Sequence, residues 1–131
     1  MELINFPAAR VLEINAFILN SEPGNKGVPD KGKLEGALAR IDNAITYQGL
    51  NDVFEIAAKY ALVIAQAHAL SDANKRTRLM VALEYLALND YEINIEREQL
   101  ADAMVDLVLN EITDKEFADL LYDCYLTNRK L

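Results

Sequence analysis

One short stretch of the chain concentrates the side chains that can do chemistry. His68 is the sole histidine of the sequence, and Asp72, Asn74, Lys75 and Arg76 follow it within eight positions. A histidine titrates near neutral pH, a carboxylate can bind Mg²⁺, and cations can bind phosphate oxygens. These residue types at this spacing predict a site for a phosphate-bearing ligand, with His68 as its general base.

The position of the stretch favours the same chemistry. An apolar segment follows it, so the amides from Ala73 to Arg76 are expected at a helix N-terminus, where the dipole favours an anion. Arg76 can bind two phosphate oxygens through its planar fork, and Lys75 supplies a mobile point charge. Asn74 can orient a phosphate oxygen or cap the helix, and the sequence leaves both roles open.

Each of these residues also has a plain structural interpretation. A lone histidine after an apolar helix is commonly a hydrogen-bonded core residue, and an isolated Asp72 or Asn74 is commonly a helix N-cap. Lys75, Arg76 and Arg78, taken alone, would form a solvated face. The functional interpretation is favoured because four polar functions converge on one turn.

Two apolar segments flank the stretch and must position it. Residues 53–67 and 79–88 are rich in Ala, Leu and Ile and have no sharply polar face, so both are expected to be largely buried helices. Asp52 is the expected N-cap of the first segment. The second is expected to end at Asn89 and Asp90.

The spacing of apolar residues predicts four further helices. They are expected over residues 8–19, 33–46, 96–109 and 113–126. Pro7 is compatible with the first turn of the first of these helices, and Thr113-x-x-Glu116 has the form of a capping box that begins the last. The prediction is an all-α fold, a compact bundle of about six helices in a single domain over residues 1–131.

The segments between these helices are predicted from their composition. Proline and glycine residues indicate a loop over 20–32, and residues 47–51 break the helical pattern. Residues 127–131 are expected to fray.

Composition excludes several classes of protein. The net charge of −8 argues against direct nucleic-acid binding, which needs a basic surface. Glu55, Lys59 and Glu84 interrupt the best membrane-span candidates, and the N-terminus lacks the features of a signal peptide. The single Cys124 excludes an internal disulfide. We therefore expect a cytoplasmic protein without a membrane segment.

The motif resembles a known family signature. His68-Ala69-Leu70-Ser71-Asp72-Ala73-Asn74-Lys75-Arg76 is similar to the signature of the Fic/Doc superfamily, and specifically to that of its Doc (death-on-curing) branch, His-x-Phe-x-Asp-Ala-Asn-Lys-Arg. Residues 27–40 look like the family segment Gly-x-x-Asp-x-Gly-x-Leu-Glu-x-Ala. Leu70 replaces the motif phenylalanine, a position expected to anchor the turn in the core. The resemblance extends over the whole chain.

The resemblance implies a function. Doc proteins are the toxins of type II toxin–antitoxin systems, and by this resemblance the chain would transfer the γ-phosphate of ATP to a threonine of elongation factor Tu and block translation. His68 would accept the proton of the attacking hydroxyl, and Asp72 would hold Mg²⁺ or orient the substrate. The remaining motif residues would bind the phosphoryl group and its neighbours: Ala73, Asn74, Lys75 and Arg76.

The resemblance also implies partners and alternatives. A Phd-type antitoxin would place its C-terminal segment as a helix in a groove of the toxin, and the antitoxin would carry the DNA binding. One alternative is a Fic-type AMP transferase, but Lys75 replaces the second glycine of the Fic motif and Leu79 replaces its downstream arginine. Another is a catalytically inactive antitoxin-binding module. A plain structural helical domain would leave the motif unexplained. Residues 47–52 fall where the family has its substrate-binding flap.

Overall fold

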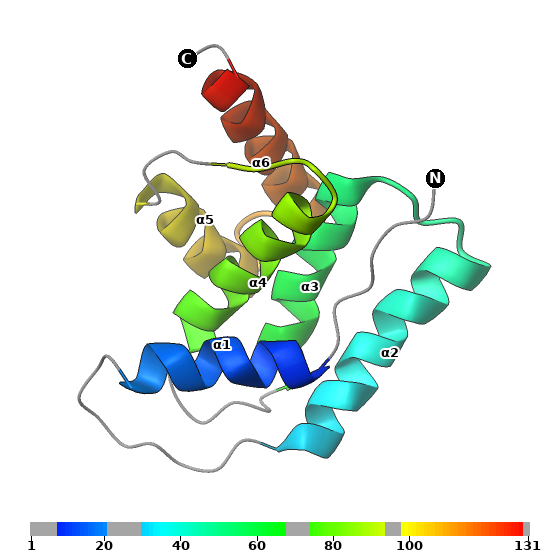
Figure 1. Cartoon of the computed structure of the whole chain (residues 1–131). Coiled ribbons are helices and arrows are strands. Elements are labelled where there is room, and N and C mark those ends of the chain that lie inside the picture. Colours follow the sequence, from blue (N-terminus) through cyan, green and yellow to red (C-terminus); the bar gives the residue numbers. More distant parts are fainter. Residues whose placement is uncertain (1–7, 21–29, 68–73, 94–97, 130–131) are drawn as a thin grey trace.

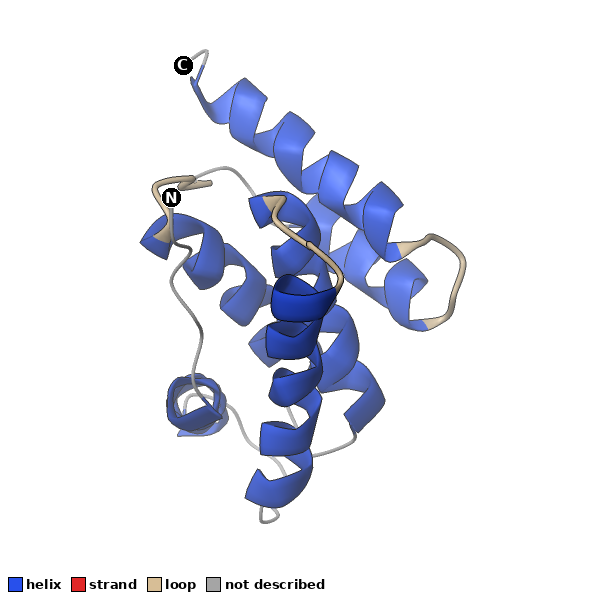
Figure 2. Ribbon diagram, turned by 90° about the vertical axis from the view of Figure 1, so that its right-hand side faces the viewer, coloured by secondary structure: helices blue, strands red, loops and turns tan. Residues whose placement is uncertain are grey.

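The computed structural model consists of packed helices (Figure 1). It describes residues 8–20, 30–67, 74–93 and 98–129. Within these ranges every regular element is a helix and no strand occurs (Figure 2). The all-α prediction is therefore confirmed.

The described residues contain six helices, in agreement with the predicted number. Their bounds are α1 Ala8–Asn20, α2 Lys31–Tyr47, α3 Val53–Ala67, α4 Asn74–Leu88, α5 Glu98–Val108 and α6 Asp114–Arg129. None of these helices is both long enough and apolar enough to cross a membrane. The expected loop residues 21–29, the first two residues of the predicted 96–109 helix, and residues 130–131 lie outside the described ranges.

Two predicted boundaries are wrong by two or more residues. Helix α2 begins at Lys31 instead of Lys33, because Asp30 acts as its N-cap and accepts a 3.1 Å hydrogen bond from the amide of Lys33. Helix α6 continues past the predicted end at Leu126 to Arg129. There the hydroxyl of Thr127 donates to the carbonyl of Asp123 at 3.0 Å, so the tail does not fray where we expected it to.

Helices α3 and α4 form the centre of the fold. They pack against each other, α3 also contacts α2, α5 and α6, and α4 also contacts α1 and α5 (Figure 1). Tyr60 of α3 and Tyr85 of α4 are fully buried, with ring centroids 4.9 Å apart. The prediction that both apolar segments are largely buried is confirmed.

Local chemistry fixes the start of two helices as predicted. Asp52 Oδ1 accepts the amides of Phe54 at 2.9 Å and Glu55 at 3.0 Å, which caps α3. At α6, the amide of Glu116 donates to the Thr113 hydroxyl and the amide of Thr113 donates to the Glu116 carboxylate, both at 3.0 Å. This reciprocal pair is a capping box.

The chain turns sharply after α4. Asp90 adopts φ 71°, and the amide of Tyr91 donates to the carbonyl of Leu86 at 2.8 Å. The side-chain amide of Asn89 donates to the carbonyl of Tyr85 at 2.9 Å. These bonds end the helix at the predicted place and hold Tyr91 beside the start of α3, where its ring contacts Phe54.

Candidate functional site

The motif occupies the connection between the two central helices. Helix α3 ends at Ala67 and α4 begins at Asn74, so Asn74, Lys75 and Arg76 form the first turn of α4. The predicted helix N-terminus at this point is confirmed, and its first amides lack intrahelical acceptors. The structure therefore supplies backbone donors and a favourable dipole for an anion at this end of α4.

Several predicted site residues lie outside what the structure describes. His68, Asp72 and Ala73 fall in residues 68–73, and of Asn74, Lys75 and Arg76 only the backbone is described. Among the described residues, no group of three or more His, Cys, Asp or Glu side chains is placed to hold a metal ion. The roles of the motif side chains thus remain predictions.

Helix α1 holds the turn that follows the motif. The side-chain amide of Asn15 donates to the hydroxyl of Thr77 at 3.1 Å, and both side chains are buried. A buried hydrogen bond of this kind is costly to break, since an unpaired polar group would be left inside the protein. The bond therefore fixes the first turn of α4 relative to α1.

A second contact between these helices lies further along α4. Arg10 forms a bidentate pair with Glu84, in which its Nε donates to Oε2 at 2.6 Å and its Nη2 donates to Oε1. Arg10 also pairs with Glu13 at 3.2 Å. Hydrogen bonding to Glu84 raises the pKa of Arg10 above its ordinary value. The pair is partly exposed, so its main effect is to orient α1 across α4.

Arg78 does not lie on a solvated face, although that was its simplest structural interpretation. Its side chain is buried, and within the described ranges its Nε has no hydrogen-bond partner. Burial lowers the pKa of Arg78 below its ordinary value. Ala82 and Tyr85, at four and seven positions further, are also buried, so Arg78 lies on a core-facing side of α4. This helical spacing is the sequence signal that identifies it.

Long side chains in a helix lean towards its N-terminus. Arg78 stands one turn after Asn74, near the N-terminal end of α4. A poorly solvated positive charge near the start of α4 would add to the attraction for an anion.

The segment expected to act as a flap does not fit that role. Residues 47–52 connect α2 to the start of α3, with Gly49 at φ 69° and the amide of Leu50 donating to the carbonyl of Ala44 at 3.1 Å. The motif follows the other end of α3. The first and last residues of α3 lie about 21 Å apart along the helix axis at a rise of 1.5 Å per residue. Tyr47 is 82% exposed at that distant end.

Comparison with known proteins connects this arrangement to a family. Residues 5–86 match the model of the Fic/DOC family, a range that spans the motif and extends into α4. This chain belongs to the Fic/DOC family. A Fic/DOC relative, the protein kinase Doc of Escherichia phage P1, is 34% identical over 102 residues, which cover 78% of this chain and 80% of the relative. The resemblance inferred from the motif is confirmed, whereas α5 and α6 lie beyond the residues that match the family model.

Proposed function

We propose that this chain is a Doc-type toxin that transfers the γ-phosphate of ATP to a threonine of elongation factor Tu. The observation that carries the proposal is the ordered set from His68 to Arg76, whose last three residues begin α4, in a member of the Fic/DOC family. The similarity to a protein kinase named Doc supports the choice of a phosphotransferase. In this proposal residues 1–131 act as one domain.

The proposed mechanism assigns a task to each motif residue. His68 accepts the proton of the threonine hydroxyl as that oxygen attacks the γ-phosphorus, and the bond to the β-phosphate oxygen breaks. Asp72 binds Mg²⁺ or orients the substrate. Lys75 and Arg76 neutralise charge on the phosphoryl group, and the amides from Ala73 onward, together with Asn74, position it. Phosphoryl transfer needs mainly positioning and charge stabilisation, which these groups supply.

The position of Leu79 favours kinase chemistry over AMP transfer. The Fic motif has an arginine there, whereas Leu79 is an apolar residue of the buried core, at 7% exposure. It cannot bind a phosphate. Lys75 replaces the second motif glycine and adds a positive charge where the Fic pattern has only backbone. Both differences leave the motif with fewer means of binding ATP in the AMP-transfer orientation.

The proposal includes partners. A Phd-type antitoxin would neutralise the toxin by binding a C-terminal amphipathic helix in a groove of the protein. ATP, Mg²⁺ and elongation factor Tu are cytoplasmic, so the proposal places the chain in the cytoplasm. Binding of DNA would belong to the antitoxin, because a chain with net charge −8 repels the phosphate backbone.

The test is mass spectrometry of purified elongation factor Tu after incubation with the protein, ATP and Mg²⁺. We expect one added phosphoryl group on a threonine, and none with His68→Ala, provided that circular dichroism shows the variant folded. Arg40→Ala, an exposed position on α2, is the matched control and should retain full transfer. Full transfer by His68→Ala would refute the base assignment. A folded wild type that leaves elongation factor Tu unmodified would refute the proposed target.

A further inference from the structure

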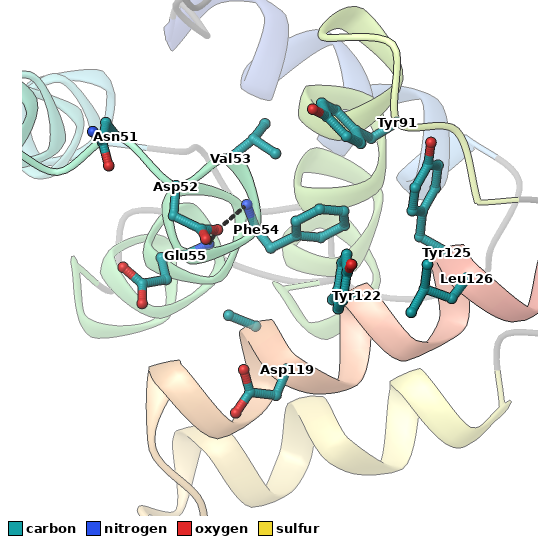
Figure 3. Close-up of a pocket in the computed structure, with 11 residues that line it drawn as sticks. Asn51, Asp52, Val53, Phe54, Glu55, Tyr91, Asp119, Tyr122, Tyr125 and Leu126 are labelled. Carbon is teal, nitrogen blue, oxygen red and sulfur yellow. Dashed lines mark hydrogen bonds between the residues drawn. The ribbon is translucent and has the colours of Figure 1, made fainter.

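A groove lies at the end of α3 and α4 that is opposite the start of α4. It has a volume of about 700 Å³ and is formed by the start of α3, the turn after α4 and the middle of α6 (Figure 3). Four aromatic residues line it, and we call it the tyrosine groove: Phe54, Tyr91, Tyr122 and Tyr125. Its volume falls in the range of ligand-binding clefts.

The aromatic rings hold one another in place. Phe54 contacts Tyr91 and Tyr122 edge to face, with centroids 5.3 and 5.2 Å apart, and Tyr91 contacts Tyr125 at 5.3 Å. Edge-to-face pairs stabilise a fixed arrangement of rings. Tyr122 remains 46% exposed and Leu126, one turn further along α6, remains 36% exposed. The groove is thus a preformed, partly apolar surface.

Carboxylates line the groove beside the aromatic rings. They belong to Asp52, Glu55 and Asp119, and no lysine or arginine of the described part of the chain lines it. Neither Glu55 nor Asp119 forms an ion pair with any residue that the structure describes. The adjacent Lys59 is paired with Asp114 at 3.1 Å. Figure 3 shows Asp52 and Glu55 at one end of the groove and the tyrosines at the other, with Phe54 between them.

We propose that the tyrosine groove binds a segment of a partner polypeptide that presents an arginine or lysine next to an apolar side chain. The faces of Tyr122 and Tyr125 attract a cation, Asp119 on the same helix pairs with it, and Leu126 contacts the neighbouring apolar group, while Glu55 at the other end of the groove adds negative potential. An acidic segment would be repelled by three carboxylates. A purely apolar one would bury them without compensation. The net charge of −8 steers a basic partner towards this surface.

The groove and the motif can be occupied at the same time. They lie at opposite ends of α3, about 21 Å apart along the helix. A partner in the tyrosine groove therefore leaves the start of α4 open. This proposal does not depend on the proposed kinase activity.

The test is an NMR titration of the full chain with acetyl-Leu-Arg-Leu-amide, compared with the matched glutamine and glutamate peptides. We expect shift changes concentrated at Tyr91, Tyr122, Tyr125 and Glu55, and roughly three-fold tighter binding of the arginine peptide than of the glutamine peptide. Equal binding of both peptides, or shifts spread over the whole surface, would overturn the proposal.

Two variants distinguish binding in the tyrosine groove from the general attraction of a basic peptide to an acidic protein. Asp119→Asn and Tyr122→Leu change exposed side chains, so they are expected to fold. Each should weaken binding of the arginine peptide by about two- to five-fold. Asp42→Asn, at an exposed position of α2, removes the same charge away from the groove and should leave binding unchanged. Equal losses with Asp42→Asn and Asp119→Asn would mean that binding reflects net charge alone.

Discussion

The side-chain amide of Asn15 in α1 donates a 3.1 Å hydrogen bond to the hydroxyl of Thr77 in α4, and both side chains are buried. Thr77 directly follows Arg76, the last residue of the motif. The contact therefore links two residues that are 62 positions apart in the chain, and it joins α1 to the helical turn that follows the motif. Helix α1, which is not one of the two central helices, therefore holds the N-terminal end of α4 in place.

Removing this bond should destabilise the protein. Thr77→Val keeps the shape of the side chain but leaves the Asn15 amide facing a methyl group, so we expect the free energy of unfolding to fall by about 1–3 kcal/mol. Urea denaturation measures the change. Thr46→Val, at an exposed position of α2, is the matched control and should change stability by less than about 0.5 kcal/mol. An unchanged Thr77→Val variant would contradict a clamping role for the bond.

For Arg78 we predict the opposite effect, that replacing the residue stabilises the protein. Its buried Nε has no partner among the described residues and burial lowers the pKa of Arg78, so the folded state carries a desolvation cost at this atom. Replacing it with methionine keeps much of the volume and removes that cost. We expect Arg78→Met to raise the free energy of unfolding by about 1 kcal/mol, measured by urea denaturation. The control is Arg40→Met at an exposed position, which should be neutral.

The same pair of variants tests the function of Arg78. If its charge assists anion binding at the start of α4, Arg78→Met should weaken nucleotide binding while stabilising the fold. Arg40→Met should alter neither property. A loss of stability in Arg78→Met would show that the guanidinium has a structural partner.

Tyr85 is expected to make the free energy of unfolding fall at alkaline pH. Burial and the nearby Tyr60 raise the pKa of Tyr85 above its ordinary value of 10.0, and no described residue forms a hydrogen bond with its hydroxyl. Above about pH 10 the unfolded chain releases the Tyr85 proton while the folded chain keeps it, so stability falls as the pH rises. Tyr85→Phe should flatten that decline in urea unfolding between about pH 9 and pH 11. Tyr47→Phe, at 82% exposure, should retain the wild-type slope.

The capping box at α6 can be tested with a conservative pair of substitutions. Glu116→Ala removes the acceptor for the Thr113 amide and should cost about 1 kcal/mol of stability. Glu116→Gln preserves a side-chain oxygen that can accept the same bond and should be nearly neutral. Thermal unfolding of both variants provides the measurement. Equal melting temperatures for the two would argue that the box contributes nothing.

Features encoded by local chemistry could be predicted from the sequence. Apolar spacing identified the helices, and Asp52 and the Thr113–Glu116 pair marked two of their starts, because each cap involves residues within one turn. The start of α2 was harder to predict, since Gly32 follows Asp30 within a segment rich in proline and glycine. The motif also indicated the family from a short continuous stretch.

Features that depend on tertiary packing could not be predicted. Phe54, Tyr91 and Tyr122 come from three distant parts of the chain, and only the packing of α3 against α6 and the turn after α4 brings their rings together. The flap role expected for residues 47–52 does not fit for a related reason. The sequence alone did not reveal that these residues adjoin the end of α3 that is far from the motif. The length of that helix separates them from the motif.

Phosphoryl transfer is tested most directly with ATP labelled in parallel at the γ- or the α-phosphate, in the presence of purified protein, Mg²⁺ and elongation factor Tu. We predict that label reaches elongation factor Tu from the γ-position alone, because Lys75 and the buried Leu79 favour kinase chemistry. Transfer of label from the α-position would mean AMP transfer and would contradict that interpretation. A folded protein that transfers neither label to elongation factor Tu would contradict the proposed reaction and favour an inactive antitoxin-binding module.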